Sequence, residues 1–337
     1  MSEENNEQPS QELAKEVVID GVVYFFMPID VAIKYSDKIK SGFFIPLSEE
    51  KRVRIEFGED DLKGKMVNYK EKGLANILFA KEDYFLFLSS IKRGLTGFFM
   101  KDDELASKTL SQQQILMLVS KAVKYIGLDD ELVAAGEENA NKVLNWVKTA
   151  PSINQYFKPF ITTNQDEHLK NLFVGFIGIG LVRALSWPPQ IYEKIMQAAL
   201  FGDFTLSDKD IMQVILANGD RSKWSKSYHI HPTEATRLLG RLKNAFSREV
   251  LRAIEQHHEL PDGSGFPNGL KGLSIDQMSA MLIVARHYVN KLIETNFAYD
   301  DRKGFIDEML SVHFDFPNFQ QPCKSLYIVM GIEVPQK

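Results

Sequence analysis

The sequence contains one cysteine, no long apolar run and no excess of basic residues. Cys323 cannot form a disulfide within the chain, and this usage suits a reducing compartment. The net charge of −5 offers no general positive field, which argues against nucleic-acid polymers and anionic membranes as partners. The most apolar stretch, residues 172–182, is too short to cross a bilayer, which needs about 20 residues. We therefore expect a cytoplasmic protein with local binding sites.

Targeting features are also missing from the N-terminus. Residues 1–16 are acidic and lack the basic start and apolar core of a signal peptide, so we interpret them as a disordered tail. With 337 residues, the chain is long enough for two domains.

Residues 17–100 predict a small α/β or mostly β domain with a regulatory or docking role. Short apolar runs such as VVIDGVVYFFMPI, GFFIPL, RVRIEF and NILFAKEDYFLFL predict strands, the last of which continues as a second strand or begins a helix. Between them, DLKGKMVNYKEKG predicts a helix with a glycine cap. None of these segments clusters histidines, forms a Gly-rich phosphate loop or pairs a nucleophile with a base.

Apolar residues at helical spacing begin near residue 103. We expect a helical connector over residues 101–160, including the Pro-containing stretch TAPSINQYFKPFITTN, and a helical domain over residues 161–337. The fold class is thus α+β. Six of the seven histidines lie between residues 167 and 294, which is where we expect the functional site.

The string HHELPDGSGFPNGLKG, residues 257–272, follows a helix that begins near Ser247 and must end before Pro261. Adjacent residues on a helix point about 100° apart, so His257 and His258 converge only if the backbone turns there. The proline and glycines that follow provide the turn. Taken alone, such a pair is more typical of helix capping than of a metal site.

Further candidate ligands precede this string on other helices. His231 and Pro232 open HPTEATRLLGRL, with the proline at the favoured first helical position. Asp203 ends IMQAALFGD and His168 begins DEHLKNLFVGF. Imidazoles and a carboxylate from several helices are a ligand set for iron, manganese or zinc inside a helical bundle. The remaining histidines are interpreted as caps or surface residues: His229, His287 and His313.

In order and spacing, these residues resemble the HD-GYP family of metal-dependent phosphohydrolases that open cyclic-di-GMP. HHELPDGSGFPNGLKG resembles the family motif HHExxDGxGYPxGLxG, while His168 with Asn171 and His231 with Pro232 resemble its HxxN and HP elements. The resemblance covers roughly residues 150–300. It implies an HD-like helical bundle as the second domain and a place in bacterial cyclic-di-GMP signalling.

The chain departs from the family pattern at several positions. The HD dyad aligns with Gly202 and Asp203, and the following lysine aligns with Leu206. The last aspartate ligand aligns with Arg286, the tyrosine of GYP is Phe266, and ETNFAY replaces DRPYR.

By the resemblance, one metal is held by Asp203, His231, His257 and His258, and this set is intact. The other set keeps only His168 and the shared Asp203. We therefore expect one divalent transition metal, iron or manganese, and no second one. Since a guanidinium cannot ligate a metal, Arg286 is expected to replace the missing positive charge, beside Asp203 or a bound phosphate, with Lys271 as a further candidate for this role.

The loop formed by Asp262, Gly263, Gly265, Phe266 and Pro267 has two interpretations. Its glycines permit close approach of the backbone to a ligand, with Asp262 capping the turn and bracing an imidazole. Alternatively, Phe266 and Pro267 fill the core and the glycines only make the turn.

Three functions stay open at this stage. The first is a binding or interaction module for cyclic-di-GMP or a protein partner, with weak or no hydrolysis. The second is a phosphodiesterase with a mononuclear site, or with an altered pair that uses Glu167 or His287 as a replacement ligand. The third is a scaffold without a ligand, and the oligomeric state is left open by the sequence.

Overall fold

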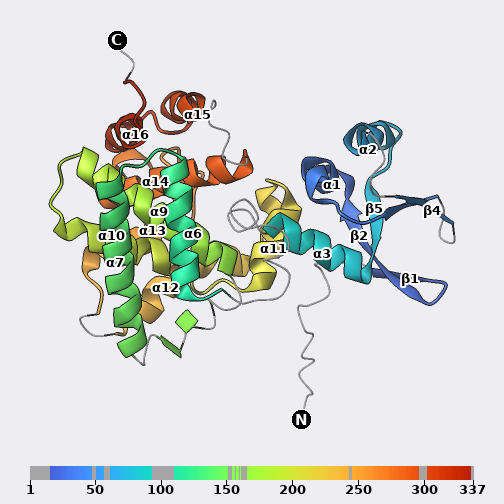
Figure 1. The fold of residues 1–337 in the computed structure, drawn as a ribbon, viewed down its shortest axis with the longest axis horizontal. Coiled ribbons are helices and arrows are strands. Elements are labelled where there is room, and N and C mark those ends of the chain that lie inside the picture. Colours follow the sequence, from blue (N-terminus) through green and yellow to red (C-terminus); the bar gives the residue numbers. More distant parts are fainter. Residues whose placement is uncertain are drawn as a thin grey trace. The chain divides into compact units, whose positions relative to one another are not determined.

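The computed structural model describes residues 16–47, 51–56, 61–92, 110–150, 154–155, 157–158, 160, 165–242, 245–295 and 302–334. The chain divides into two compact units, shown in Figure 1. The first comprises residues up to Arg93 together with Lys209–Ser225, and the second comprises Gly94–Asp208 and Lys226–Lys337. A small α/β unit and a helical unit confirm the predicted fold class. The predicted tail before residue 16 and much of the stretch around residues 151–164 lie outside the described residues.

The first unit is built on a five-stranded antiparallel sheet in the order β1-β2-β5-β3-β4. Its strands are β1 (Glu16–Ile19), β2 (Val22–Pro28), β3 (Phe43–Pro46), β4 (Arg52–Ile55) and β5 (Asn76–Ala80). Asp20 and Gly21 join β1 to β2 with φ angles of 52° and 75°. Both central residues of a two-residue type I′ hairpin need positive φ, which Asp-Gly supplies at low cost.

Helices pack with this sheet in the first unit, and alternate strand residues form the core of the unit. The elements are α1 (Ile29–Lys34), η2 (Ser36–Lys38), α2 (Leu62–Glu71) and α3 (Lys81–Lys92). Met27, Phe43 and Phe79 are buried in this core. NILFAKEDYFLFL is thus a strand followed by a helix, and DLKGKMVNYKEKG is the predicted helix, which ends before Gly73 at a φ of 91°.

A segment from the later part of the chain completes the first unit. It contains α11 (Asp208–Ala217) and η3 (Arg221–Lys223). Met212 and Leu216 pack against the core of the sheet unit. The Ser225 hydroxyl donates to Asp210 Oδ1 at 2.7 Å, which ties the two ends of this segment together. Residues 209–225 thus belong by packing to the first unit, whose predicted range ends at residue 100.

The second unit is helical. Its elements are α6 (Gln112–Tyr125), α7 (Asp130–Thr149), α9 (Gln165–Ala184), α10 (Gln190–Phe201), α12 (Lys226–Gly240), α13 (Arg248–Gln256), η4 (Gly272–Ser274), α14 (Gln277–Glu294), α15 (Arg302–Glu308), η5 (Met309–His313) and α16 (Pro317–Val329).

The centre of this unit is α9, which contacts α6, α7, α10, α14 and α16. Its apolar run is buried on all sides, as expected for a helix that is hydrophobic all round. At Gly178 an added Cβ would lie 2.5 Å from the Ile195 side chain, so the glycine permits close packing of α9 on α10. Among the residues that the structure describes, no helix is both long and apolar enough to pass through a bilayer.

One helix start differs from the sequence prediction. We expected His231 and Pro232 to open a helix, but α12 begins at Lys226 and Pro232 lies inside it. The prediction was wrong because it took proline as a mark of the first turn, whereas residues 226–230 already adopt helical geometry. This location of Pro232 affects the site described below.

Candidate metal centre

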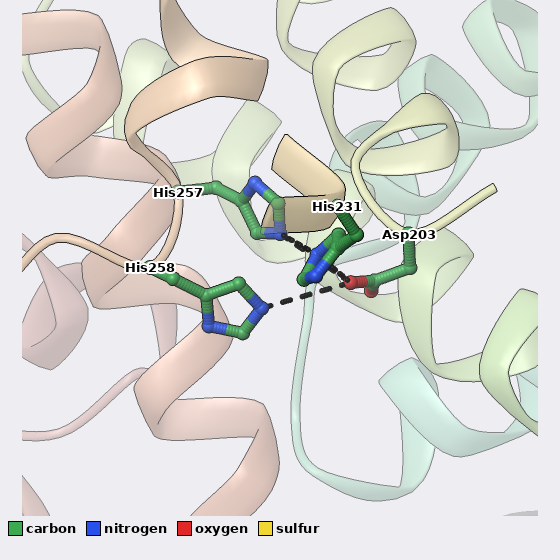
Figure 2. Close-up of side chains that lie close together, drawn as sticks. All are labelled: Asp203, His231, His257 and His258. Carbon is green, nitrogen blue, oxygen red and sulfur yellow. Dashed lines mark hydrogen bonds and ion pairs between the residues drawn. The ribbon is translucent and has the colours of Figure 1, made fainter. Parts of the chain in front are cut away.

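Four predicted ligands from separate parts of the second unit meet in its interior. Asp203 follows α10, His231 lies within α12, and His257 and His258 follow α13. One ligand atom from each lies within 4.8 Å of every other. Figure 2 shows the three imidazoles and the carboxylate turned toward one another. Asp203 is fully buried, as are His231 and His257, while His258 is partly exposed.

Backbone carbonyls orient two of these rings. His231 Nδ1 lies 2.5 Å from the Tyr228 carbonyl oxygen, and His257 Nδ1 lies 2.6 Å from the Ile254 carbonyl oxygen. A carbonyl oxygen only accepts, so each neutral ring carries its proton on Nδ1 and donates it to the backbone. Each Nε2 therefore presents a lone pair to the cluster, as in metal-binding histidines.

The spacing of these lone pairs fits one cation. Asp203 Oδ1 lies 3.2 Å from His231 Nε2, 3.3 Å from His257 Nε2 and 3.7 Å from His258 Nε2. The Nε2 atoms of His231 and His257 are 3.3 Å apart. Four ligands at the usual 2.0–2.2 Å from a tetrahedral ion are separated by about 3.3–3.6 Å. Acceptors this close repel one another unless positive charge lies between them.

The ionisation states of the cluster agree with that fit. Burial lowers the pKa of His257 to about 4, with Arg286 adding to the effect, and burial together with the neighbouring His257 holds the pKa of His258 well below its usual value. Burial alone would raise the pKa of Asp203, but the charge of Arg286 and the contacts with the imidazoles outweigh it and hold that pKa well below its usual range. Neutral imidazoles beside a carboxylate are the forms that bind a metal.

The other face of Asp203 is paired with Arg286 from α14. The guanidinium donates from Nη1 to Asp203 Oδ2 at 2.7 Å and from Nη2 to Oδ1 at 3.1 Å. Arg286 is only 8% exposed, so this bidentate pair is buried. Such a pair fixes both the charge and the direction of the carboxylate.

Two more polar side chains act on the guanidinium. Burial by itself would lower the pKa of Arg286, but the charge and hydrogen bonds of Asp203, together with Tyr228 and the charge of Glu167, act in the opposite direction and leave it raised. Glu167 also forms an ion pair with Lys170 one turn along α9. The positive charge of Arg286 is thus held in place by several elements of the unit.

The motif loop is organised by Glu259, a residue to which the sequence analysis gave no role. This fully buried carboxylate accepts from the Asn268 amide at 2.7 Å through Oε1 and from the Leu270 amide at 2.8 Å through Oε2. Gly265 lies so close to the start of the loop that an added Cβ would be 2.2 Å from the Leu260 nitrogen. The sequence does contain a signal for this loop-organising role: an acidic residue that directly follows paired histidines and precedes a Gly-rich loop.

The remaining loop residues brace the loop and the rings. Asp262 Oδ1 accepts from the Ser264 amide at 2.8 Å, so the predicted turn cap is present. Phe266 stacks on His258, with ring centroids 4.5 Å apart and planes inclined by 18°. Gly263 has a φ of 83°, Pro267 follows Phe266, and Lys271 is exposed. The loop therefore packs against the ligand histidine through its aromatic ring.

His168 lies outside the four-residue cluster. It is fully buried on α9, and its ring meets Phe157 edge-on at 5.7 Å. Burial lowers its pKa to about 4. Neither ring nitrogen, nor the amide of the equally buried Asn171, has a hydrogen-bond partner among the described residues. His168 and Asn171 are thus two buried polar side chains in a largely apolar surrounding.

The structure also shows the surroundings of the alternative ligand His287, of the other histidines and of Leu206. The His287 ring packs against His313 at 4.9 Å and Phe314 at 5.2 Å, and His229 packs against Phe266 at 5.1 Å. Leu206, at the position of the family lysine, is a buried core residue. None of these residues belongs to the ligand cluster formed by the described residues.

Comparisons with known proteins found a family model and a solved structure that are similar to this chain. Residues 180–303 match the family model of the HD domain, and this segment contains the four clustered ligands and the motif loop. No curated protein matches. A solved structure described as Bd1817, an HDG"Y"P protein from Bdellovibrio bacteriovorus, is similar at 16% identity and a TM-score of 0.38, over 91% of this chain and 99% of that chain. The HD match implies divalent metal binding, for which the four residues form a suitable site.

Proposed function

We propose that the chain, whose residues 180–303 match the HD domain, is an HD-GYP-type binding or interaction protein of cyclic-di-GMP signalling, with weak or no phosphodiesterase activity. In this proposal Asp203, His231, His257 and His258 hold one iron or manganese ion, and Arg286 replaces the second. The observation that carries the proposal is the buried bidentate pair of Arg286 with Asp203.

The expected loss of activity follows from what a guanidinium lacks. A bound divalent cation acts as a Lewis acid and lowers the pKa of a bound water, and two-metal phosphodiesterases use one ion on each side of the reacting phosphorus. Arg286 supplies one positive charge and N–H donors but cannot bind and activate water. Leu206 and Phe266 also lack the ammonium and hydroxyl groups of the family residues.

The same arrangement still suits phosphate binding. Arg286 keeps its charge at every physiological pH, and a guanidinium binds phosphate oxygens well. The Phe266 ring over His258 adds an apolar surface beside the cluster. A phosphodiester held by one exchangeable cation and one fixed cation would be bound without being readily cleaved.

The first unit would provide the regulatory input. Lys209–Ser225 packs within it, and this segment connects Asp203 at one end with His231 at the other. A molecule that binds the first unit and rearranges the core around Met212 and Leu216 would therefore shift Asp203 and His231 through the short segments of chain that lead to them. The partner of this unit is a protein or a small molecule.

Metal analysis and turnover together test the proposal. Protein purified without chelator is expected to contain one equivalent of iron or manganese per chain, and Asp203→Asn is expected to contain none. Calorimetry is expected to show binding of cyclic-di-GMP, with no release of linear product in added Mn²⁺. Two equivalents of metal, or rapid hydrolysis that requires His257 and Asp203, would show instead a working phosphodiesterase.

A mononuclear phosphodiesterase is the second candidate. It is favoured by the complete set of three imidazoles and one carboxylate, which suffices to hold an ion with an open position. Turnover that is slow, saturable and abolished in His257→Ala would support this candidate, and Arg286→Ala separates the two by showing whether Arg286 assists or blocks the reaction.

A further inference from the structure

We propose that Pro232 is a positioning residue of the metal centre. By lacking a backbone N–H, it leaves the Tyr228 carbonyl to the His231 ring, and this contact turns Nε2 of the ring toward Asp203. The metal in this inference rests on the proposed function, while the orientation of the ring is a separate property of the fold.

The argument begins with the position of His231 in the second turn of α12. In an α-helix each carbonyl accepts from the amide four residues later, so the Tyr228 carbonyl would accept from residue 232. Proline has no amide hydrogen, and its ring displaces the carbonyl one turn before it. Pro232 therefore frees the Tyr228 oxygen and tilts it away from the helix ladder.

His231 uses the oxygen that Pro232 frees. Its Nδ1 lies 2.5 Å from the Tyr228 oxygen, so Nδ1 carries the ring proton. Nε2 is left as an acceptor, 3.2 Å from Asp203 Oδ1 and 3.3 Å from His257 Nε2. With an amide at position 232, two donors would compete for one carbonyl, and the ring would lose part of the force that fixes its orientation.

His257 reaches the same geometry by another route. Its Nδ1 also contacts the carbonyl three residues earlier, at Ile254, over 2.6 Å. There α13 ends at Gln256, so residue 258, whose amide would continue the ladder to Ile254, lies outside the helix. One ligand histidine thus obtains a free carbonyl from a helix end, and the other, inside a helix, obtains it from the proline that follows.

The test compares Pro232→Ala with Pro322→Ala, which replaces the interior proline of α16. Both variants gain a helical amide, but only the first lies beside a ligand. Pro232→Ala is expected to weaken Mn²⁺ binding by roughly 10–100-fold in calorimetry, the range for residues that orient ligands. Its metal-free thermal midpoint is expected to stay equal to wild type or rise. Pro322→Ala is expected to bind Mn²⁺ as wild type does.

Opposite changes in stability and affinity are not expected of a proline with a merely structural role. Unchanged Mn²⁺ affinity in Pro232→Ala would overturn the proposal, and so would an equal loss in both variants. Nitrogen NMR of the histidine rings in metal-free protein gives a second measurement. We expect His231 to be protonated at Nδ1 in wild type and to become a mixture of tautomers in Pro232→Ala. If wild type binds no Mn²⁺, the proposed function fails, and an unchanged tautomer then also rejects the role of Pro232.

Discussion

The buried carboxylate of Asp203 faces three imidazoles on one side and a guanidinium on the other, and the two sides suit different kinds of positive charge. On the imidazole side, His231, His257 and His258 direct Nε2 atoms at Asp203 Oδ1. On the guanidinium side, Arg286 donates to both oxygens. The first side suits a cation that binds and leaves, whereas the second carries a cation attached to the chain. Under the proposed function, structural charge balance and exchangeable metal binding would thus both depend on the carboxylate of Asp203.

Removal of the attached cation is expected to have the largest effect. Arg286→Ala leaves the fully buried Asp203 without its partner, and loss of one member of a buried ion pair costs about 3–5 kcal/mol. Urea denaturation in the presence of a chelator measures this loss. Mn²⁺ is expected to restore part of it, because a cation on the imidazole side neutralises the same carboxylate.

Arg286→Lys is the matched control for charge. It keeps the positive charge and loses the bidentate geometry, so a smaller loss of stability is expected. A loss below about 1 kcal/mol in Arg286→Ala, the usual value of an exposed pair, would contradict the buried pairing.

Removal of the predicted metal ligand His257 is expected to have the next largest effect. It distinguishes His257 from the equally buried His168. His257→Ala is expected to lower Mn²⁺ affinity by more than the roughly 100-fold that loss of an orienting residue causes. His168→Ala is expected to leave Mn²⁺ affinity unchanged, since His168 lies outside the cluster. Calorimetry on both variants measures this difference. An equal loss in His168→Ala would mean that this histidine reaches the metal after all.

The residues on both sides of Asp203 could be predicted from the sequence because a long motif and local chemistry both carry information about their positions. The alignment of HHELPDGSGFPNGLKG and of Asp203 and Arg286 brought together residues up to 83 positions apart, because a long motif fixes the register of several helices at once. The strand content of residues 17–100 and the helix start at Ser247 were predicted from local chemistry alone.

Other features needed the packed structure. The start of α12 was misplaced because proline marks a first turn more often than an interior turn. The separation of His168 from the ligands is decided by how α9 packs, which no local pattern encodes. Packing of Lys209–Ser225 into the first unit was not predicted either, since this segment lies more than 100 residues after the rest of that unit.

The third prediction concerns His168 and the dependence of stability on pH. His168 has a pKa lowered from 6.5 to about 4, so between these values the unfolded chain binds a proton that the folded protein does not. Stability therefore falls as pH falls, by about 1.4 kcal/mol per pH unit for this group and by about 2 kcal/mol at pH 5. Urea denaturation of metal-free His168→Leu between pH 7 and 5 should show a correspondingly weaker pH dependence.

Asn171→Leu is the matched control for that titration. The asparagine shares the burial of His168 and also lacks hydrogen-bond partners among the described residues, but it does not titrate. Its replacement is expected to change stability at neutral pH and to leave the pH dependence as in wild type. Identical pH profiles for wild type and His168→Leu would show that the pKa of His168 is the same in the folded and unfolded states.

The smallest effect is expected at Gly202, where the family has the histidine of its HD dyad. The backbone there is helical, with a φ of −56°, and an added Cβ would lie 3.4 Å from the Ala198 oxygen and from the His257 ring. These are ordinary contacts, so Gly202→Ala is expected to stabilise the metal-free protein by about 0.5–1 kcal/mol and to leave Mn²⁺ binding unchanged. Gly265→Ala, with its Cβ 2.2 Å from the Leu260 nitrogen, should instead destabilise by about 1–3 kcal/mol. A gain at Gly202 would mean that crowding does not force glycine at the dyad position. Under the proposed function, the fixed charge of Arg286, rather than lack of space, would then account for the expected absence of a second metal, whereas a loss at Gly202 would assign that absence to packing.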